Sequence, residues 1–231
     1  EVPWQPGLAR ADANLAKIEA RLASPSAPRR VSFCLEGPAG TGKSAWARHL
    51  ARVIGMPVIE KRASDLMSKW VGESEQNIAR AFSDARADGA MLIFDEADSL
   101  LADRRGAERS WEVSQVNEML TWMESHPLPF ACTTNLVEQL DPATARRFSL
   151  KIGFLPLSIE QRTACFRRFF KSDPPTGLLT LDQLTPGDFA VVAKRSILLG
   201  ISEPEAILIE LRREQSAKPN TRNPIGFRAA S

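Results

Sequence analysis

An eight-residue segment, Gly37–Ser44, restricts the possible folds of this chain more than any other part of the sequence. Its residues are Gly37, Pro38, Ala39, Gly40, Thr41, Gly42, Lys43 and Ser44, and they fit the pattern G-x-x-x-x-G-K-[ST] at every fixed position. The apolar run Val31–Leu35 precedes the segment, and the helical pattern Lys43–Ile54 begins within it. Glycines let backbone N–H groups turn toward phosphate oxygens, and the start of a helix adds partial positive charge. The pattern therefore predicts a phosphate-binding loop in which Lys43 neutralises phosphate charge and the Ser44 hydroxyl binds Mg²⁺.

Two acidic residues directly follow another apolar run. Ala90–Phe94 is followed by Asp95 and Glu96. Successive side chains at the end of a strand point in different directions, so one carboxylate can face a metal ion while the other faces a water molecule. We expect Asp95 to bind Mg²⁺ and Glu96 to act as the base that polarises the water attacking the γ-phosphate. Open α/β sheets bind ligands at the carboxyl ends of their strands, where both motifs would lie.

Strand and helix patterns alternate as far as Pro156. Apolar runs predict further strands at 58–59, 129–133 and 150–154, and helical spacing predicts helices at 8–22, 75–87 and 111–123. Strands that alternate with helices predict a three-layer α/β/α fold with a five-stranded parallel sheet.

After Pro156 the strand patterns end. Helical patterns occupy 159–170, 188–199 and 203–217. We therefore expect a small all-helical subdomain after the α/β subdomain. The expected divisions are a linker helix at 1–30, the large subdomain at 31–156, the helical lid at 157–218 and a tail at 219–231.

Composition excludes some classes of partner and compartment. The net charge is +2 and the basic residues are scattered in pairs, so no strong field favours nucleic acid or membrane. No apolar run approaches the roughly 20 residues that span a bilayer. The cysteines Cys34, Cys132 and Cys165 are far apart in sequence, which predicts buried reduced thiols and a cytoplasmic setting. Because the first residue is Glu1, we expect the chain to be a fragment of a longer protein.

Taken together, these motifs resemble the AAA+ ATPases, specifically the AAA subgroup. Phe94–Leu100 looks like the extended Walker B motif of that family, and the resemblance covers about Val31–Lys218. It implies ATP and Mg²⁺ as cofactors, hydrolysis of ATP to ADP and phosphate, and assembly into a ring, expected to be a hexamer. Cys132–Asn135 is similar to the sensor 1 strand of the family, which gives Asn135 the role of holding the attacking water or the γ-phosphate.

Asp141–Phe148 resembles the arginine-finger segment of the family. Its adjacent arginines, Arg146 and Arg147, are like those of katanin and spastin relatives, in which both reach the γ-phosphate bound to the neighbouring subunit. A guanidinium suits this role because it stays charged and donates two parallel hydrogen bonds. The sequence leaves open which of the two arginines is the main finger.

Ser68–Glu75 looks like the central-pore loop of the family, with Lys69, Trp70, Val71 and Gly72 as the substrate-contacting residues. The family usually has Tyr or Phe where this chain has Trp70. The resemblance implies that this aromatic side chain grips an extended polypeptide.

Two features of the helical part resemble the family only partly. Pro186–Phe189 corresponds in position to the start of the lid helix of the family, and the resemblance makes Gly187 a candidate for contacting nucleotide. No clear sensor 2 arginine is present, as in other members of the AAA subgroup. We expect Arg195, further along the same helix, to lie at the surface.

The function expected from these patterns is ATP hydrolysis coupled to remodelling, unfolding or threading of protein substrates. A small-molecule kinase would need neither a pore loop nor an arginine finger. A nucleic-acid motor is disfavoured by the near-neutral charge. A ring that binds ATP as a regulatory switch or adaptor remains an alternative, although the presence of Glu96 favours turnover.

Overall fold

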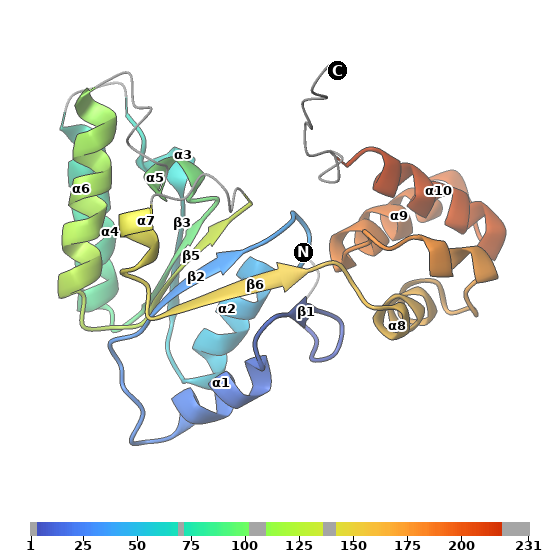
Figure 1. Cartoon of the computed structure of the whole chain (residues 1–231), viewed down its shortest axis with the longest axis horizontal. Helices are drawn as coiled ribbons and strands as arrows, with labels where there is room; N and C mark the ends of the chain where they lie inside the picture. Colours follow the sequence, from blue (N-terminus) through green and yellow to red (C-terminus); the bar gives the residue numbers. More distant parts are fainter. Residues whose placement is uncertain (1–3, 69–71, 102–109, 136–141, 219–231) are drawn as a thin grey trace, which may run out of the picture. The chain divides into compact units, whose positions relative to one another are not determined.

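The chain contains two compact units, Glu1–Leu155 and Pro156–Ser231. Our computed structural model of the chain describes residues 4–68, 72–101, 110–135 and 142–218 (Figure 1).

The first unit is built on a six-stranded sheet with the strand order β1-β6-β2-β5-β4-β3. The strands are β1 (Arg10–Ala11), β2 (Ser32–Glu36), β3 (Val58–Arg62), β4 (Met91–Asp95), β5 (Phe130–Thr134) and β6 (Leu150–Leu155). The five strands from β2 to β6 are parallel to their neighbours, so the predicted parallel sheet is confirmed. The short β1 adds an antiparallel edge strand beside β6, which the sequence analysis did not anticipate.

The β1 strand replaces the first part of the helix expected at 8–22. The helix α1 (Leu15–Ala23) begins only after Asn14, whose side chain accepts the Lys17 N–H at 3.0 Å as an N-cap. Before it, the Asp12 N–H donates to the Gly153 carbonyl at 2.9 Å, and the Asp12 carboxylate accepts the Gly153 N–H at 2.9 Å. Two strand residues are too few to show alternation, so only the partner strand reveals them. Residues 1–30, expected as a linker, thus contribute a strand and a helix to the first unit.

Helices cover both faces of the sheet (Figure 1). The remaining helices of this unit are α2 (Lys43–Val53), α3 (Ala63–Leu66), α4 (Glu73–Ala87), α5 (Asp98–Leu101), α6 (Ser110–Ser125) and α7 (Pro142–Ala145). Side chains alternate along the strands: Phe33 and Leu35 pack with residues of α1 and α2, whereas Cys34 packs with residues of α3 to α6. The predicted three-layer α/β/α architecture follows from this alternation.

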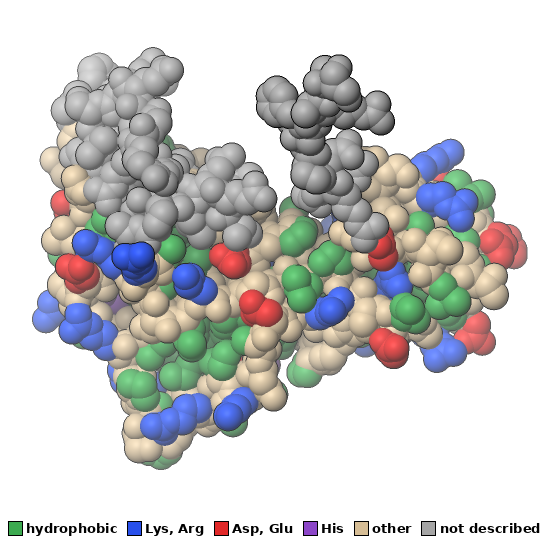
Figure 2. Space-filling model, viewed as in Figure 1, with side chains coloured by type: hydrophobic (Ala, Val, Ile, Leu, Met, Phe, Trp, Pro, Cys, Tyr) green, Lys and Arg blue, Asp and Glu red, His purple; other side chains and the backbone are tan. Residues whose placement is uncertain are grey.

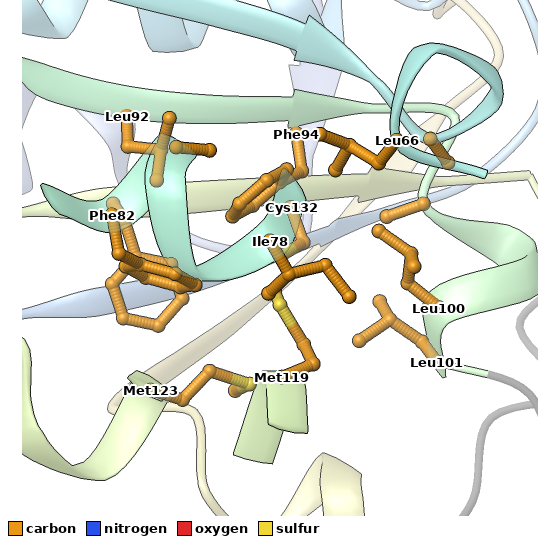
Figure 3. Close-up of a cluster of buried hydrophobic side chains, with 14 of the residues drawn as sticks. Leu66, Ile78, Phe82, Leu92, Phe94, Leu100, Leu101, Met119, Met123 and Cys132 are labelled. Carbon is orange, nitrogen blue, oxygen red and sulfur yellow. The ribbon is translucent and has the colours of Figure 1, made fainter. Parts of the chain in front are cut away.

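Each face of the sheet has its own buried core. On one face Phe82 of α4 contacts Phe94 and Phe130, with ring centroids 5.3 and 5.7 Å apart, and Figure 3 shows the aliphatic and methionine side chains around it. On the other face Trp46 of α2 is fully buried and packs edge-on against Phe33, with ring centroids 5.7 Å apart. This packing fixes α2, and with it the loop that precedes α2, against the sheet.

The second unit is helical, with α8 (Ile159–Phe170), the 3₁₀ helix η3 (Thr176–Thr180), α9 (Pro186–Leu199) and α10 (Pro204–Ser216). The helix α9 starts two residues before its predicted position, because Pro186 suits the first turn and Thr185 forms a capping box with Asp188. Lys218 reaches back from the end of α10 and donates to the Asp188 carboxylate at 2.5 Å.

Side chains of both charge signs appear on the face shown in Figure 2. Within the described ranges, we find no helix that combines the length and the hydropathy needed to cross a bilayer.

Candidate functional site

The predicted phosphate loop connects the end of β2 to the start of α2. Gly37 has a φ of +133°, and a Cβ atom there would lie 2.1 Å from the Phe154 carbonyl oxygen of β6, so only glycine fits. The Thr41 hydroxyl donates to the Pro38 carbonyl at 2.8 Å and fixes the turn of the loop. The loop therefore curls back over the amino end of α2, as phosphate binding requires.

Gly42, the last glycine of the loop, has a φ of +99° and lies against the N-terminal segment. A Cβ atom there would be 3.4 Å from the Trp4 ring. Trp4 also faces His49 of α2, with ring centroids 6.0 Å apart. The sequence analysis missed Trp4, because its partners come from a loop and a helix far along the chain.

Lys43 is almost fully buried at the start of α2. Its ammonium group donates to the carbonyls of Gly37 at 2.7 Å and Pro38 at 2.9 Å, and to Oδ1 of Asn135 at 2.8 Å. Burial lowers the pKa of Lys43 to about 8, against the opposing attraction of carboxylates led by Asp95. The structure thus brings the predicted lysine and asparagine together from two different strand–loop junctions.

Ser44 and Asp95 meet as well. The Ser44 hydroxyl donates to Oδ1 of Asp95 at 2.5 Å, and the Thr133 hydroxyl donates to the same oxygen at 2.6 Å. A serine hydroxyl and a carboxylate are oxygen ligands of the kind that Mg²⁺ prefers. Among the residues that the structure describes, no cluster of three or more His, Cys, Asp or Glu side chains could hold a metal ion. The Ser44 and Asp95 oxygens fit Mg²⁺, which commonly takes one or two protein groups together with phosphate and water.

Glu96 follows Asp95 in a left-handed backbone conformation, with a φ of +54°. This conformation costs a non-glycine residue on the order of 1–2 kcal/mol, and such residues cluster at functional sites. The Glu96 N–H donates to the Thr133 hydroxyl at 3.0 Å, which holds the turn, while the residue itself is exposed. Glu96, which directly follows Asp95 in the chain, is therefore accessible to water.

Residues that the sequence analysis did not assign connect these groups. Thr133 bonds to both Asp95 and the Glu96 backbone. The Asp98 carboxylate accepts the Thr134 hydroxyl and, at 3.1 Å, the Asn135 N–H. Thr133, Thr134 and Asp98 lie inside the recognised motifs, but the spacing of these residues in the sequence does not reveal which strand end each one contacts.

Arg146 and Arg147 do not join this cluster. They precede β6, whose amino end pairs with the amino end of β2, whereas the phosphate loop follows the carboxyl end of β2. Both residues are exposed, and Arg147 forms an ion pair with Glu124 at 2.6 Å. The two arginines therefore lie at the opposite edge of the sheet from Lys43.

The other candidates have mixed outcomes. Lys69, Trp70 and Val71 lie outside the described residues, while Gly72 has a φ of +84° at the start of α4. Gly187 lies in the first turn of α9. Arg195 is half-buried and forms ion pairs with Glu210 and Glu214 of α10.

Comparison with known proteins agrees with this geometry. The family model described as "ATPase family associated with various cellular activities (AAA)" matches residues 33–155. The chain is 31% identical over 199 residues to the Cell division cycle protein 48 homolog of Archaeoglobus fulgidus, covering 79% of this chain and 27% of that protein. It is 32% identical over 181 residues to Protein SAV of Sulfolobus acidocaldarius, covering 72% of this chain and 23% of that protein.

A plant relative matches a shorter stretch. The protein Suppressor of K(+) transport growth defect 1 of Arabidopsis thaliana is 35% identical over 133 residues, covering 54% of this chain and 30% of that protein. This chain thus spans less than a third of the length of each of these relatives. With the family match extending from β2 to β6, and the phosphate loop and the carboxylate pair both inside it, the chain belongs to the AAA family of ATPases.

Proposed function

We propose that this chain is the ATP-hydrolysing motor domain of a ring-forming protein that remodels, unfolds or threads protein substrates. The observation that carries the proposal is the position of the Lys43 ammonium group. It lies within hydrogen-bond distance of the phosphate loop and of Asn135, beside the Ser44–Asp95 pair.

The proposed roles follow from this arrangement. Lys43 neutralises phosphate charge, and the loop N–H groups orient the phosphates. Ser44 and Asp95 would hold Mg²⁺, whose charge would polarise the phosphoryl oxygens. Glu96 accepts a proton from the attacking water, and Asn135 orients that water or the γ-phosphate.

Titration calorimetry of ATP with Mg²⁺ into nucleotide-stripped protein tests the proposal. Wild-type protein should bind, whereas Lys43→Ala should lose detectable binding because the phosphate charge is no longer neutralised. Lys17→Ala removes an exposed lysine from α1 and is the matched control, with affinity as in the wild type. Absence of heat with the wild-type protein, or unchanged affinity of Lys43→Ala, would refute the phosphate-loop assignment.

We also propose that Arg146 and Arg147 serve the site of a neighbouring subunit in a ring, which we expect to be a hexamer. Their position at the edge of the sheet opposite Lys43 supports a role in trans, because they are remote from the site of their own chain. Arg147 would exchange its ion pair with Glu124 for the phosphate of the neighbour.

Subunit mixing tests the role in trans. Arg147→Ala should bind ATP and hydrolyse it poorly, and addition of wild-type subunits should restore turnover beyond their own share. Arg80→Ala on the exposed part of α4 is the control. Strictly proportional turnover at every mixing ratio would contradict the composite site.

The substrate is proposed to be an extended polypeptide gripped by the segment Lys69–Gly72. Trp70→Ala should lose the stimulation of ATP turnover that an unfolded polypeptide produces in the wild-type ring. If single-stranded DNA stimulates turnover and the polypeptide does not, a nucleic-acid motor is the better interpretation. If neither stimulates it, the switch or adaptor ring is favoured.

A cytoplasmic setting is also proposed, supported by the free, buried thiols of Cys34, Cys132 and Cys165.

A further inference from the structure

The junction between β4 and β5 is held by backbone and side-chain hydrogen bonds beyond the last paired positions of the two strands. The paired positions of the two strands end at Phe94 and Cys132. Beyond them the Ala97 N–H donates to the Thr133 carbonyl at 2.8 Å, and the Glu96 N–H donates to the Thr133 hydroxyl at 3.0 Å. The left-handed conformation of Glu96 turns the chain so that the next residues return to the end of β5.

Asp98 completes this junction. One oxygen of its carboxylate accepts both the Thr134 hydroxyl and, at 3.1 Å, the Asn135 N–H. Asp98 is only partly exposed, which strengthens hydrogen bonds to its charge. Asn135 is exposed, and Oδ1 of its side chain accepts a hydrogen bond from the Lys43 ammonium group at 2.8 Å. Hydrogen bonds therefore run from Asp98 through Asn135 to Lys43 and the phosphate loop.

We infer that Asp98 is a positioning residue, which fixes the backbone at Asn135 so that the amide side chain reaches Lys43 and the reacting groups. The inference rests on the proposed ATPase function. Asp98 acts through Asn135, and its effect comes from the acceptor oxygen.

The rival explanation is that Asp98 only stabilises the short helix α5, which it begins. An acidic residue in the first turn of a helix commonly has that role. The rival predicts a loss of stability without a specific loss of turnover. It also predicts that effects of changes at Asp98 and Asn135 multiply.

Steady-state ATPase assays at saturating ATP and Mg²⁺, on the full chain, separate the two explanations. Asp98→Ala should lower kcat about tenfold, the size of effect expected when a charged hydrogen bond that positions a reacting group is lost. Asp98→Asn keeps the acceptor oxygen and should recover most of the activity. Asp65→Ala is the control, because Asp65 also accepts a backbone N–H in the first turn of a short helix, but its donor is the local N-cap residue Arg62 of α3. Its kcat should equal that of the wild type.

A double variant identifies the route of the effect. Asn135→Ala alone should lower kcat at least as much as Asp98→Ala, and adding Asp98→Ala to it should lower kcat no further. Losses that multiply would overturn the inference. So would wild-type kcat in Asp98→Ala, or an Asp98→Asn variant as slow as Asp98→Ala.

Two further measurements keep the inference testable if Asp98→Ala folds poorly or turnover is absent. Thr134→Val deletes one of the two donors to Asp98 with little change in volume, and should lower kcat by a smaller factor than Asp98→Ala. Hydrogen exchange at the Asn135 amide should be faster in Asp98→Asn and faster still in Asp98→Ala, while amides of β4 stay protected. Unchanged exchange at Asn135 would overturn the inference even in a protein without ATPase activity. Failure of the wild-type protein to bind ATP would instead refute the proposed function.

Discussion

Among the residues that the structure describes, each unit buries one cation, and the two cations differ in their surroundings. Lys43 in the first unit and Arg162 in the second are 6% and 4% exposed. Both donate to backbone carbonyls, Lys43 to those of the phosphate loop and Arg162 to those of Leu181 and, at 3.4 Å, Leu179. In both, burial lowers the pKa of the side chain. Burial of a charge therefore does not by itself distinguish a reactive site from a structural brace.

The groups around each buried cation distinguish the reactive site from the structural brace. Lys43 also bonds to the exposed Asn135 side chain, and Asp95, Asp98 and Glu96 all act on its charge. Arg162 holds η3 to α8 within one unit: it donates to the carbonyls of Leu179 and Leu181, and Asp182 and Glu160, in or beside these helices, act on its charge. A buried cation that meets several polar side chains at strand ends can bind a ligand, whereas one held by the backbone carbonyls and carboxylates of neighbouring helical segments stabilises a fold.

The largest effect that tests this comparison concerns Glu96. If the polar groups around Lys43 form a working site, Glu96→Gln should lower ATP turnover about 10²- to 10⁴-fold, because the amide cannot accept the proton of the attacking water. Its ATP affinity should be retained. Glu205→Gln, at an exposed position of α10, is the control. Normal turnover of Glu96→Gln in an ATPase assay would remove Glu96 as the base.

The next effect compares how much each of the two buried cations contributes to the free energy of unfolding. Arg162→Met should lower the free energy of unfolding by about 3 kcal/mol, because two carbonyls of the helical unit lose their donors. At pH 7, Lys43→Met should lower it by less, about 1 kcal/mol, because only the buried Gly37 carbonyl is left without a donor, whereas water can reach the exposed Pro38 and Asn135.

Two signals in urea unfolding separate the units. All five tryptophans precede residue 156, so tryptophan fluorescence follows the first unit alone, whereas far-UV circular dichroism follows both. Arg162→Met should shift the circular dichroism transition and leave the fluorescence transition in place. Equal shifts in both signals would contradict the assignment of Arg162 to the second unit alone.

A smaller effect is the pH dependence that the Lys43 side chain gives to the free energy of unfolding. Its pKa falls from 10.5 to about 8 on folding, so between these values the unfolded chain binds more protons and stability rises with pH. The rise between pH 8 and 10.5 should be about 2 to 3 kcal/mol, and Lys43→Met should lack it. Cys34 and Cys165, whose pKa values burial raises to about 12, act in the opposite direction equally in both proteins. Parallel stability curves for the two proteins from pH 8 to 10.5 would contradict the prediction.

The phosphate loop and the Asp95–Glu96 pair could be predicted from sequence because each is a continuous segment whose spacing carries its chemistry. The β1 strand could not, because the bonded residues Asp12 and Gly153 are 141 positions apart. The junction of Asp98 with Asn135 was missed for the same reason, since two strand ends must first be placed side by side. Patterns with a local cause predict elements, while contacts between elements need the fold.

The smallest expected effect concerns Arg195, which tests whether the comparison of the two buried cations applies to a third, half-buried one. The sequence analysis expected it at the surface, but it is half-buried and bonds to Glu210 at 2.9 Å and Glu214 at 2.7 Å, joining α9 to α10. Arg195→Met should lower the Tm by about 2 °C at low salt, and by less at high salt, because partly exposed ion pairs are weak and screened. Lys194→Met, at the exposed neighbouring position, should leave the Tm unchanged.

Nucleotide affinity decides to which of the two kinds of cation Arg195 belongs. As a structural cation like Arg162, its loss should leave ATP affinity in calorimetry equal to that of the wild type. A tenfold loss of affinity with an unchanged Tm would instead place Arg195 with Lys43 as a ligand-binding cation. The rule that the partners of a cation decide its role would then fail, because all the partners of Arg195 described in the structure lie on α10 of its own unit.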